Sequence, residues 1–172
     1  MNLQSDDFEL FGLERSFAQD RAVLDSRWKD LQRQAHPDKF AAQGAAAQRV
    51  AMQWSVRINE AYQRLKDPHK RAAYLCELHG APVNAENNTA MPTWFLMQQM
   101  AWREELEAAV SVEDLQKIGL QVNKSGCETL LKTEQLLDFA HDFQGAVAQV
   151  RALMFIERFS RDVDARLEQL EN

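Results

Sequence analysis

Residues 31–40 read LQRQAHPDKF, and they separate two stretches that are typical of long amphipathic helices. Before them, apolar residues recur at spacings of three or four from Leu24 to Ala35, as a helix face that packs on a core requires. Pro37 disfavours helical geometry at the residue before it, so the first helix is expected to end near His36. The turn therefore consists of an imidazole, a proline, a carboxylate and a lysine, where simpler turns between helices use Gly, Asn or Ser.

The helix before this turn has a basic outer face. Lys29 and Arg33 lie four residues apart and point away from the predicted core, Arg27 flanks the core stripe, and Lys39 follows the turn. The chain as a whole is acidic, with a net charge of −6, which argues against non-specific binding to nucleic acid or to anionic membranes. A positive strip on an acidic protein is suited to steering an acidic partner.

The rest of the chain predicts an all-α fold. Only four prolines and six glycines occur in 172 residues, and β-branched residues do not alternate over a strand-length window. We expect a short apolar helix at 8–13, a helix over 45–66, and a helix that begins at Pro68 and ends at Gly80. The core stripe of the helix over 45–66 is predicted to be Val50, Trp54, Ile58, Ala61 and Leu65.

A segment rich in Asn, Pro and small residues, APVNAENNTAMPT, predicts a boundary between two domains. We place an N-terminal domain at 1–80, a linker at 81–91, and a C-terminal domain at 92–172.

Three helices are expected in the C-terminal domain, and short turns between them predict a small antiparallel bundle. The first covers about 92–109. Ser111 and Asp114 resemble a capping box, so the second begins there and extends to about 139, with Gly119 and Gly126 as weak points. The third covers about 142–170.

The helix over 92–109 has two apolar faces. Phe95, Trp102, Leu106 and Ala109 form a core stripe, yet other large apolar residues lie off it. The last helix likewise carries one Phe about 110° from the centre of its own stripe. This off-core set is Leu96, Met97, Met100, Glu104 and Phe155. Either the helix is buried on both sides, against its own bundle and against the N-terminal domain, or the second face is a groove for a partner, a role that adaptable Met side chains suit. Homodimer formation through this face is a further alternative.

Two stretches, LQRQAHPDKF (31–40) and INEAYQRLKDPHKRAAY (58–74), resemble the J domain of DnaJ-type co-chaperones in motif, order and spacing. The resemblance covers roughly residues 5 to 79 and implies a helical hairpin with short flanking helices. It implies that the His-Pro-Asp turn docks on an ATP-bound DnaK-type chaperone and stimulates its ATPase. Ala35 departs from the pattern, because many J domains have Tyr there. The residues that the resemblance assigns to this contact are His36, Pro37, Asp38, Arg27, Lys29 and Arg33.

Over its full length the chain resembles the HscB family, the J-type co-chaperones of iron–sulfur cluster assembly. The J domain, the short linker and FLMQQMAWREELE (95–107) carry this resemblance. It implies that the C-terminal domain binds the scaffold protein IscU and that the J domain engages the specialised chaperone HscA. The residues that match the scaffold-binding surface are Leu96, Met97, Met100, Glu104 and Phe155. Ala101 and Ala108 stand where relatives can carry acidic residues, so the acidic part of the surface is thinner here.

No chemistry of its own is expected from such an adaptor, so we predict neither an enzyme nor a bound cofactor. Cys76 and Cys127 lie far apart without metal-ligand spacing, so no metal site is expected and a reducing, cytoplasmic setting is the simplest interpretation. There is no apolar run of membrane-spanning length. Two alternatives remain: a general J-domain co-chaperone that presents other clients to a DnaK-type chaperone, and a metal-dependent enzyme that uses His36 and Asp38.

Overall fold

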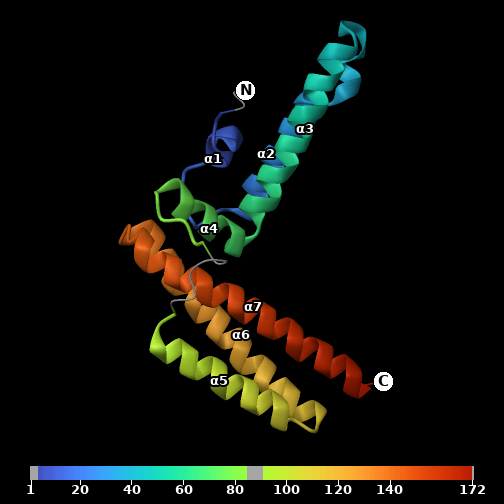
Figure 1. The fold of residues 1–172 in the computed structure, drawn as a ribbon. Coiled ribbons are helices and arrows are strands. Elements are labelled where there is room, and N and C mark those ends of the chain that lie inside the picture. The colour runs from blue at the N-terminus through green and yellow to red at the C-terminus, as the bar shows by residue number, and fades with distance from the viewer. Residues whose placement is uncertain (1–3, 85–90, 172) are drawn as a thin grey trace. The chain divides into compact units, whose positions relative to one another are not determined.

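The computed structural model describes residues 4–84 and 91–171, and in these ranges the chain consists of helices without strands (Figure 1). The predicted all-α fold is confirmed. The chain divides into two compact units, Met1–Leu75 and Cys76–Asn172, so the division falls inside a helix. The domain bounds 1–80, 81–91 and 92–172 therefore stay a prediction, and residues 85–90 of the expected linker lie outside the described ranges.

The helices agree closely with the periodicity of the sequence. Two short elements of other types occur as well: the 3-10 helix η1 directly after the His-Pro-Asp turn begins, and the π-helix η2 that continues α6. In chain order the elements are α1 (Asp7–Phe11), α2 (Arg21–Gln34), η1 (Pro37–Gln43), α3 (Ala45–Lys66), α4 (Pro68–Leu78), α5 (Thr93–Ala108), α6 (Val112–Glu134), η2 (Gln135–Phe139) and α7 (Phe143–Glu171).

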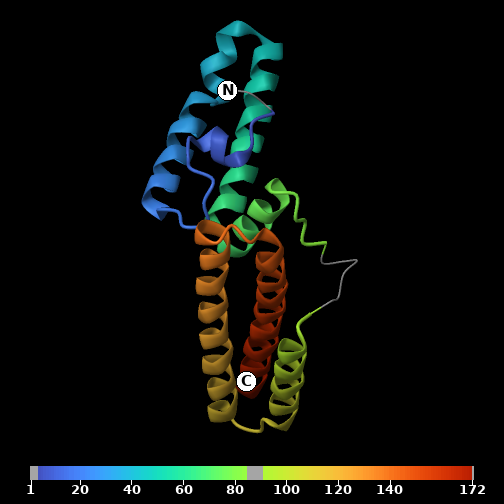
Figure 2. The same cartoon turned by 90° about the vertical axis from the view of Figure 1, so that its left-hand side faces the viewer.

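In the N-terminal unit, α2 and α3 run side by side as an antiparallel hairpin (Figures 1 and 2). Leu24 is the one residue within α2 that is fully buried, so apolar contact alone holds α2 weakly against α3. Aromatic stacking and amide hydrogen bonds supplement it. Trp28 stacks on Tyr62 with 4.8 Å between ring centroids. The Asn59 side-chain oxygen accepts from Trp28 Nε1 at 2.9 Å and from Gln32 Nε2 at 2.7 Å. These polar contacts fix α2 against α3 in a single register.

A buried carboxylate ties α1 to α3. Asp7 is fully buried, and its side-chain oxygens lie 2.6 Å from Arg57 Nη2 and 3.0 Å from Arg64 Nη1. Its amide N–H donates to the Tyr74 hydroxyl at 3.0 Å. A carboxylate taken out of water costs several kcal/mol unless cations and donors surround it. Asp7 is therefore compatible only with the position between these two arginines, which fixes where α1 packs.

The bounds predicted for α3 are those found. At its N-terminal end, however, the buried residue is one position later in the chain than predicted. Val50 was expected in the core and is 51% exposed, whereas Ala51 is buried. Val50, Trp54 and Ile58 of the predicted stripe are spaced four residues apart. Over these eight residues the side-chain direction turns by about 80° around the helix axis, so Val50 does not share a face with Ile58. Ala51 lies within about 20° of Ile58 and takes the core position instead.

The C-terminal unit contains α5, α6 and α7 packed side by side (Figure 2). The predicted capping box is confirmed: Ser111 Oγ accepts from the Asp114 N–H at 3.1 Å, and Asp114 Oδ2 accepts from the Ser111 N–H at 3.2 Å. All three helices contribute to one core, whose buried members are Phe95, Trp102, Ala109, Leu115, Ile118, Val122, Ala152, Ile156, Phe159 and Val163. Leu170, in the last turn of α7, lies outside this core and is 40% exposed.

The chain after α4 is fastened to α7 before the undescribed stretch begins. The His79 ring stacks on Phe143 at 3.8 Å between centroids, and the Arg151 guanidinium donates twice to the Val83 carbonyl, at 3.0 and 2.7 Å. Ala81 is buried, and burial also raises the pKa of the Cys76 thiol to about 11, which keeps it protonated at neutral pH. Ala81 and Val83, at the start of the expected linker, therefore have fixed positions within the unit Cys76–Asn172.

The two glycines inside α6 lie where that helix approaches α7, and the helix continues through both. A Cβ atom built on Gly126 would lie 3.5 Å from Ile156 Cγ2, and one on Gly119 would lie 4.0 Å from Val163 Cγ1. Both distances are those of ordinary van der Waals contact, so a methyl group fits at each position.

Gly126→Ala should therefore stabilise the C-terminal unit, because Gly in a helix interior costs about 1 kcal/mol relative to Ala. We expect thermal unfolding, followed by far-UV dichroism, to show a Tm raised by about 4 °C. Gly80→Ala is the matched control and should lower Tm, since Gly80 has a left-handed φ of 73°. A lowered Tm for Gly126→Ala would mean that α6 and α7 approach more closely than described here.

Candidate functional site

The His-Pro-Asp turn presents two polar side chains to solvent in a fixed arrangement. α2 ends at Gln34, and His36 caps η1: its Nδ1 accepts a hydrogen bond from the Asp38 N–H at 3.3 Å and lies 3.6 Å from Asp38 Oδ2. Pro37 opens η1, a position where its missing N–H removes no helical hydrogen bond. The His36 and Asp38 side chains are 58% and 89% exposed. The turn therefore stops the helix and exposes an imidazole and a carboxylate together.

This geometry is suited to recognition. Because His36 Nδ1 accepts the backbone hydrogen bond, the ring proton of the neutral imidazole is on Nε2, which leaves one donor for a partner. Asp38 offers carboxylate oxygens beside it. Across residues 4–84 and 91–171, no cluster of three or more His, Cys, Asp or Glu side chains is able to hold a metal ion.

The structure brings together two of the three predicted basic residues. Lys29 and Arg33 lie about 40° apart on the wheel of α2, on the side that leads to His36, and both are exposed. Arg27 is also exposed but lies about 160° further round the helix from Lys29. Arg33 pairs with Asp30 at 3.3 Å, an exposed contact that contributes little to stability and leaves the guanidinium accessible.

The second apolar face of α5 is exposed as the wheel predicts. Phe95 and Trp102 are almost fully buried, whereas Leu96, Met97 and Met100 are 43%, 66% and 63% exposed. Glu104 is exposed one turn further along the helix. The α5 patch, defined as Leu96, Met97, Met100 and Glu104, is therefore free of the bundle's own core, which excludes burial of the helix on both sides within its own unit.

Phe155 does not belong to this exposed set, and its expected off-core position was wrong. Its ring is half-buried, lies edge-on to Phe95 at 5.6 Å and is stacked on Phe159 at 5.9 Å. The Arg103 guanidinium covers it at 5.7 Å. Because α7 packs against both α5 and α6, its buried arc is wider than a single stripe. Phe155 therefore lies at the rim of the core, against the buried face of α5.

Sequence reasoning missed one exposed aromatic residue on α5. Trp94 is 55% exposed and contacts the edge of the adjacent Phe95 ring at 5.4 Å. It precedes Met97 by three residues, a spacing that places the two side chains on neighbouring positions of the helix surface. That spacing was the available signal.

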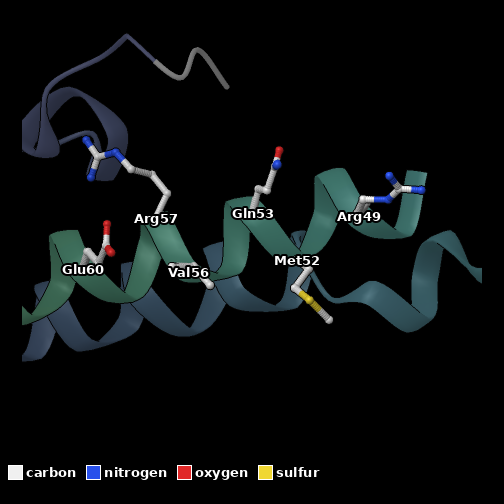
Figure 3. A pocket seen from close by; sticks show the side chains of 6 residues that line it. All are labelled: Arg49, Met52, Gln53, Val56, Arg57 and Glu60. Carbon is white, nitrogen blue, oxygen red and sulfur yellow. The ribbon is translucent and has the colours of Figure 1, made fainter. Parts of the chain in front are cut away.

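A separate hollow of about 380 Å³ lies on α3 (Figure 3). Met52 and Val56 supply its apolar surface, and Arg49 and Arg57 flank them. The Arg57 side chain points towards α1, where it pairs with Asp7. None of the site residues expected from the sequence lines this hollow.

No helix in the described ranges is both long enough and apolar enough to cross a membrane.

Truncation should separate the patch from the core. Phe155→Ala is expected to destabilise the C-terminal unit by about 2 kcal/mol, less than the ~3–5 kcal/mol of a fully buried Phe. Met97→Ala, at an exposed position, should stay within about 0.5 kcal/mol of the unmodified protein. Urea unfolding followed by dichroism measures both. Equal losses from the two substitutions would show that Met97 is also a core residue.

The chain is similar to known proteins over its whole length. Residues 91–164 match the family model described as the HSCB C-terminal oligomerisation domain. The co-chaperone protein HscB homologs of Burkholderia thailandensis and Burkholderia cenocepacia are 48% and 45% identical, over 100% and 99% of this chain and 99% of each relative.

Two solved structures agree with the fold. Chaperone HscB from Vibrio cholerae is 34% identical, with a TM-score of 0.81 over 96% of this chain and 99% of that one. The human co-chaperone protein HscB is 26% identical, with a TM-score of 0.89 over 96% of this chain and 84% of that one. With a J domain followed by a C-terminal helical domain, the chain belongs to the HscB family of co-chaperones.

Proposed function

We propose that this co-chaperone acts in iron–sulfur cluster assembly. It binds the scaffold protein IscU through the α5 patch, delivers it to the chaperone HscA and stimulates the HscA ATPase. The observation that carries the proposal is the division of α5 into two apolar faces. Phe95 is buried in the bundle while Met97 and Met100 are more than 60% exposed. Contiguous exposed apolar surface on a folded domain marks an interaction site.

The chaperone contact is assigned to the turn and to the basic face beside it. His36 and Asp38 supply an N–H donor and a carboxylate at the end of α2, and Lys29 and Arg33 lead to them. Positive side chains on an acidic protein accelerate encounter with an acidic surface and orient it. Pro37 and the more distant Arg27 complete the set that the family resemblance assigns to this contact.

The scaffold contact is assigned to the C-terminal domain, with Leu96, Met97, Met100 and Glu104 on the exposed face of α5 and the half-buried Phe155 on α7. One molecule that holds both partners raises the effective concentration of the scaffold at the chaperone without any new contact between those two. This role requires no cofactor and no catalysis by the co-chaperone itself, because the chaperone hydrolyses ATP. We place the activity in the cytoplasm and retain the domain bounds 1–80, 81–91 and 92–172.

A general J-domain co-chaperone is the second candidate, in which the same domain presents other clients to a DnaK-type chaperone. Met97 and Met100 favour it to some degree, since flexible Met side chains adapt to varied surfaces. The two functions differ in selectivity: a dedicated adaptor binds folded IscU and not an unfolded client such as a reduced, carboxymethylated protein.

His36→Gln should abolish stimulation of the HscA ATPase, because glutamine cannot reproduce the imidazole that accepts the Asp38 N–H while donating outward. Steady-state ATP hydrolysis by HscA, with and without the co-chaperone, measures the effect. Affinity for IscU in isothermal calorimetry should be unchanged. His69→Gln, at another imidazole of the N-terminal unit, is the control. Full stimulation by His36→Gln would contradict the assignment of the turn.

Leu96→Ala combined with Met97→Ala should weaken IscU binding at least about tenfold, since the few residues at the centre of an interface supply most of its binding energy. Calorimetry measures the affinity, and far-UV dichroism should remain that of the unmodified protein. Leu120→Ala, at a residue of α6 that is 70% exposed, is the matched control and should bind normally. An unchanged affinity in the double variant would move the scaffold contact elsewhere on the protein.

A further inference from the structure

Trp94 is an unusual tryptophan in this protein. All four tryptophans lie in the described ranges, and Trp94 alone among them is exposed by more than half, at 55%. Trp102 is buried in the bundle, and Trp28 and Trp54 are half-buried in the N-terminal unit. Tryptophan has a large apolar surface and is highly buried on average. A reason for its exposure on α5 is therefore required.

The fold of the C-terminal unit does not provide that reason. α5 begins at Thr93 after Pro92, and no side chain caps this end, so Trp94 has no capping role. The partly buried residues packed on the bundle core are Met91, Leu106, Phe155 and Leu167, and Trp94 is not among them. Its ring contact is the edge of Phe95, the next residue in the chain. Most of the indole surface lies outside the packing of the unit.

Trp94 extends the three apolar residues of the α5 patch, Leu96, Met97 and Met100, into a continuous surface without charge. On the helical wheel, Leu96, Met100, Met97 and Trp94 follow one another over an arc of about 160°. Residues 94–102 contain no charged side chain, and the first charge on α5 is Arg103. On the wheel, Ala101 lies between Trp94 and Met97, one to two turns further along the helix. Its side chain is small, so it does not cover the indole. The carboxylate of Glu104 stands at the far end of the surface.

We propose that Trp94 is the main anchor of scaffold recognition, and that this surface binds an uncharged, apolar area of the scaffold protein. The inference rests on the proposed function and specifies how that contact is made. Tryptophan is enriched among residues that dominate binding energy, because it buries about 150–250 Å² while only two side-chain torsions become fixed. Methionines beside it adapt to the partner, and Glu104 orients the complex from the rim.

The affinity experiment uses purified IscU from the same organism without a bound cluster, titrated in calorimetry. We expect Trp94→Ala to raise Kd at least about tenfold, as a hot-spot residue does, and Trp94→Phe to raise it only a few-fold. Both variants should keep the Tm of the unmodified protein. Phe139→Ala, at a residue that is 74% exposed in the same unit, is the control and should leave Kd unchanged. Raising sodium chloride from about 0.1 to 0.5 M should change Kd less than about twofold, since screening acts on charges alone.

A fluorescence measurement on the unmodified protein tests the same point without any substitution. IscU should shift the tryptophan emission to shorter wavelength and protect it from acrylamide, and Trp94→Phe should remove both effects. Unchanged emission and quenching on addition of IscU would overturn the proposal. This result does not depend on the stability of Trp94→Ala, because it is measured on the unmodified protein. A Kd that rises steeply with salt would also overturn it, because charge would then dominate the contact.

The affinities of the variants distinguish the role of Trp94 from the role of the α5 patch. If Trp94→Ala binds IscU normally while the Leu96→Ala and Met97→Ala double variant does not, the anchor assignment is wrong and the proposed function stands. If neither variant loses affinity, the α5 patch itself is not the scaffold site.

Discussion

A proline ring restricts the backbone of the residue before it, and this steric constraint sets three of the helix boundaries in this chain. α2 ends just before Pro37, α4 begins at Pro68, and α5 follows Pro92, so a proline lies between α2 and α3, at the start of α4, and between α4 and α5. Because the sequence has little tendency to form strands, helix is the default between these points, and the prolines decide where each helix face begins. The same restriction ends α2 before His36, so that the His36 side chain at the cap of η1 and the Asp38 side chain in its first turn are both exposed to solvent.

Much of the fold could be predicted because a helix repeats its environment every 3.6 residues. The bounds of α3 and the Ser111 capping box follow from local pattern alone. The errors arise where packing depends on more than one neighbour. Val50 was assigned to the core by steps of four that drift around the helix, and Phe155 was placed off the core because the wheel of α7 cannot show that α5 also packs against it. Both errors concern angle, and neither concerns which segments are helical.

The candidate site was predictable in its exposed residues and less so in its support. Met97 and Met100 stand out because no core position accounts for them, whereas Trp94 is missed because a tryptophan beside Phe95 is easily taken for core. Asp7 gives no sign in the sequence that it is buried, since its two arginine partners lie about fifty residues away along the chain. Long-range electrostatic pairing of this kind is visible only after folding.

The hydrogen bond from Asp7 to Tyr74 has a consequence for synthesis on the ribosome. It joins residues 67 positions apart, at opposite ends of the N-terminal unit, so that unit cannot complete its packing until Tyr74 has left the exit tunnel. The C-terminal unit is different, because α6 and α7 are consecutive in the chain and separated by a short turn. Its low contact order favours rapid closure as soon as α7 emerges. The N-terminal unit therefore depends on a contact between its two ends, whereas the C-terminal unit is built mainly from contacts between neighbouring helices.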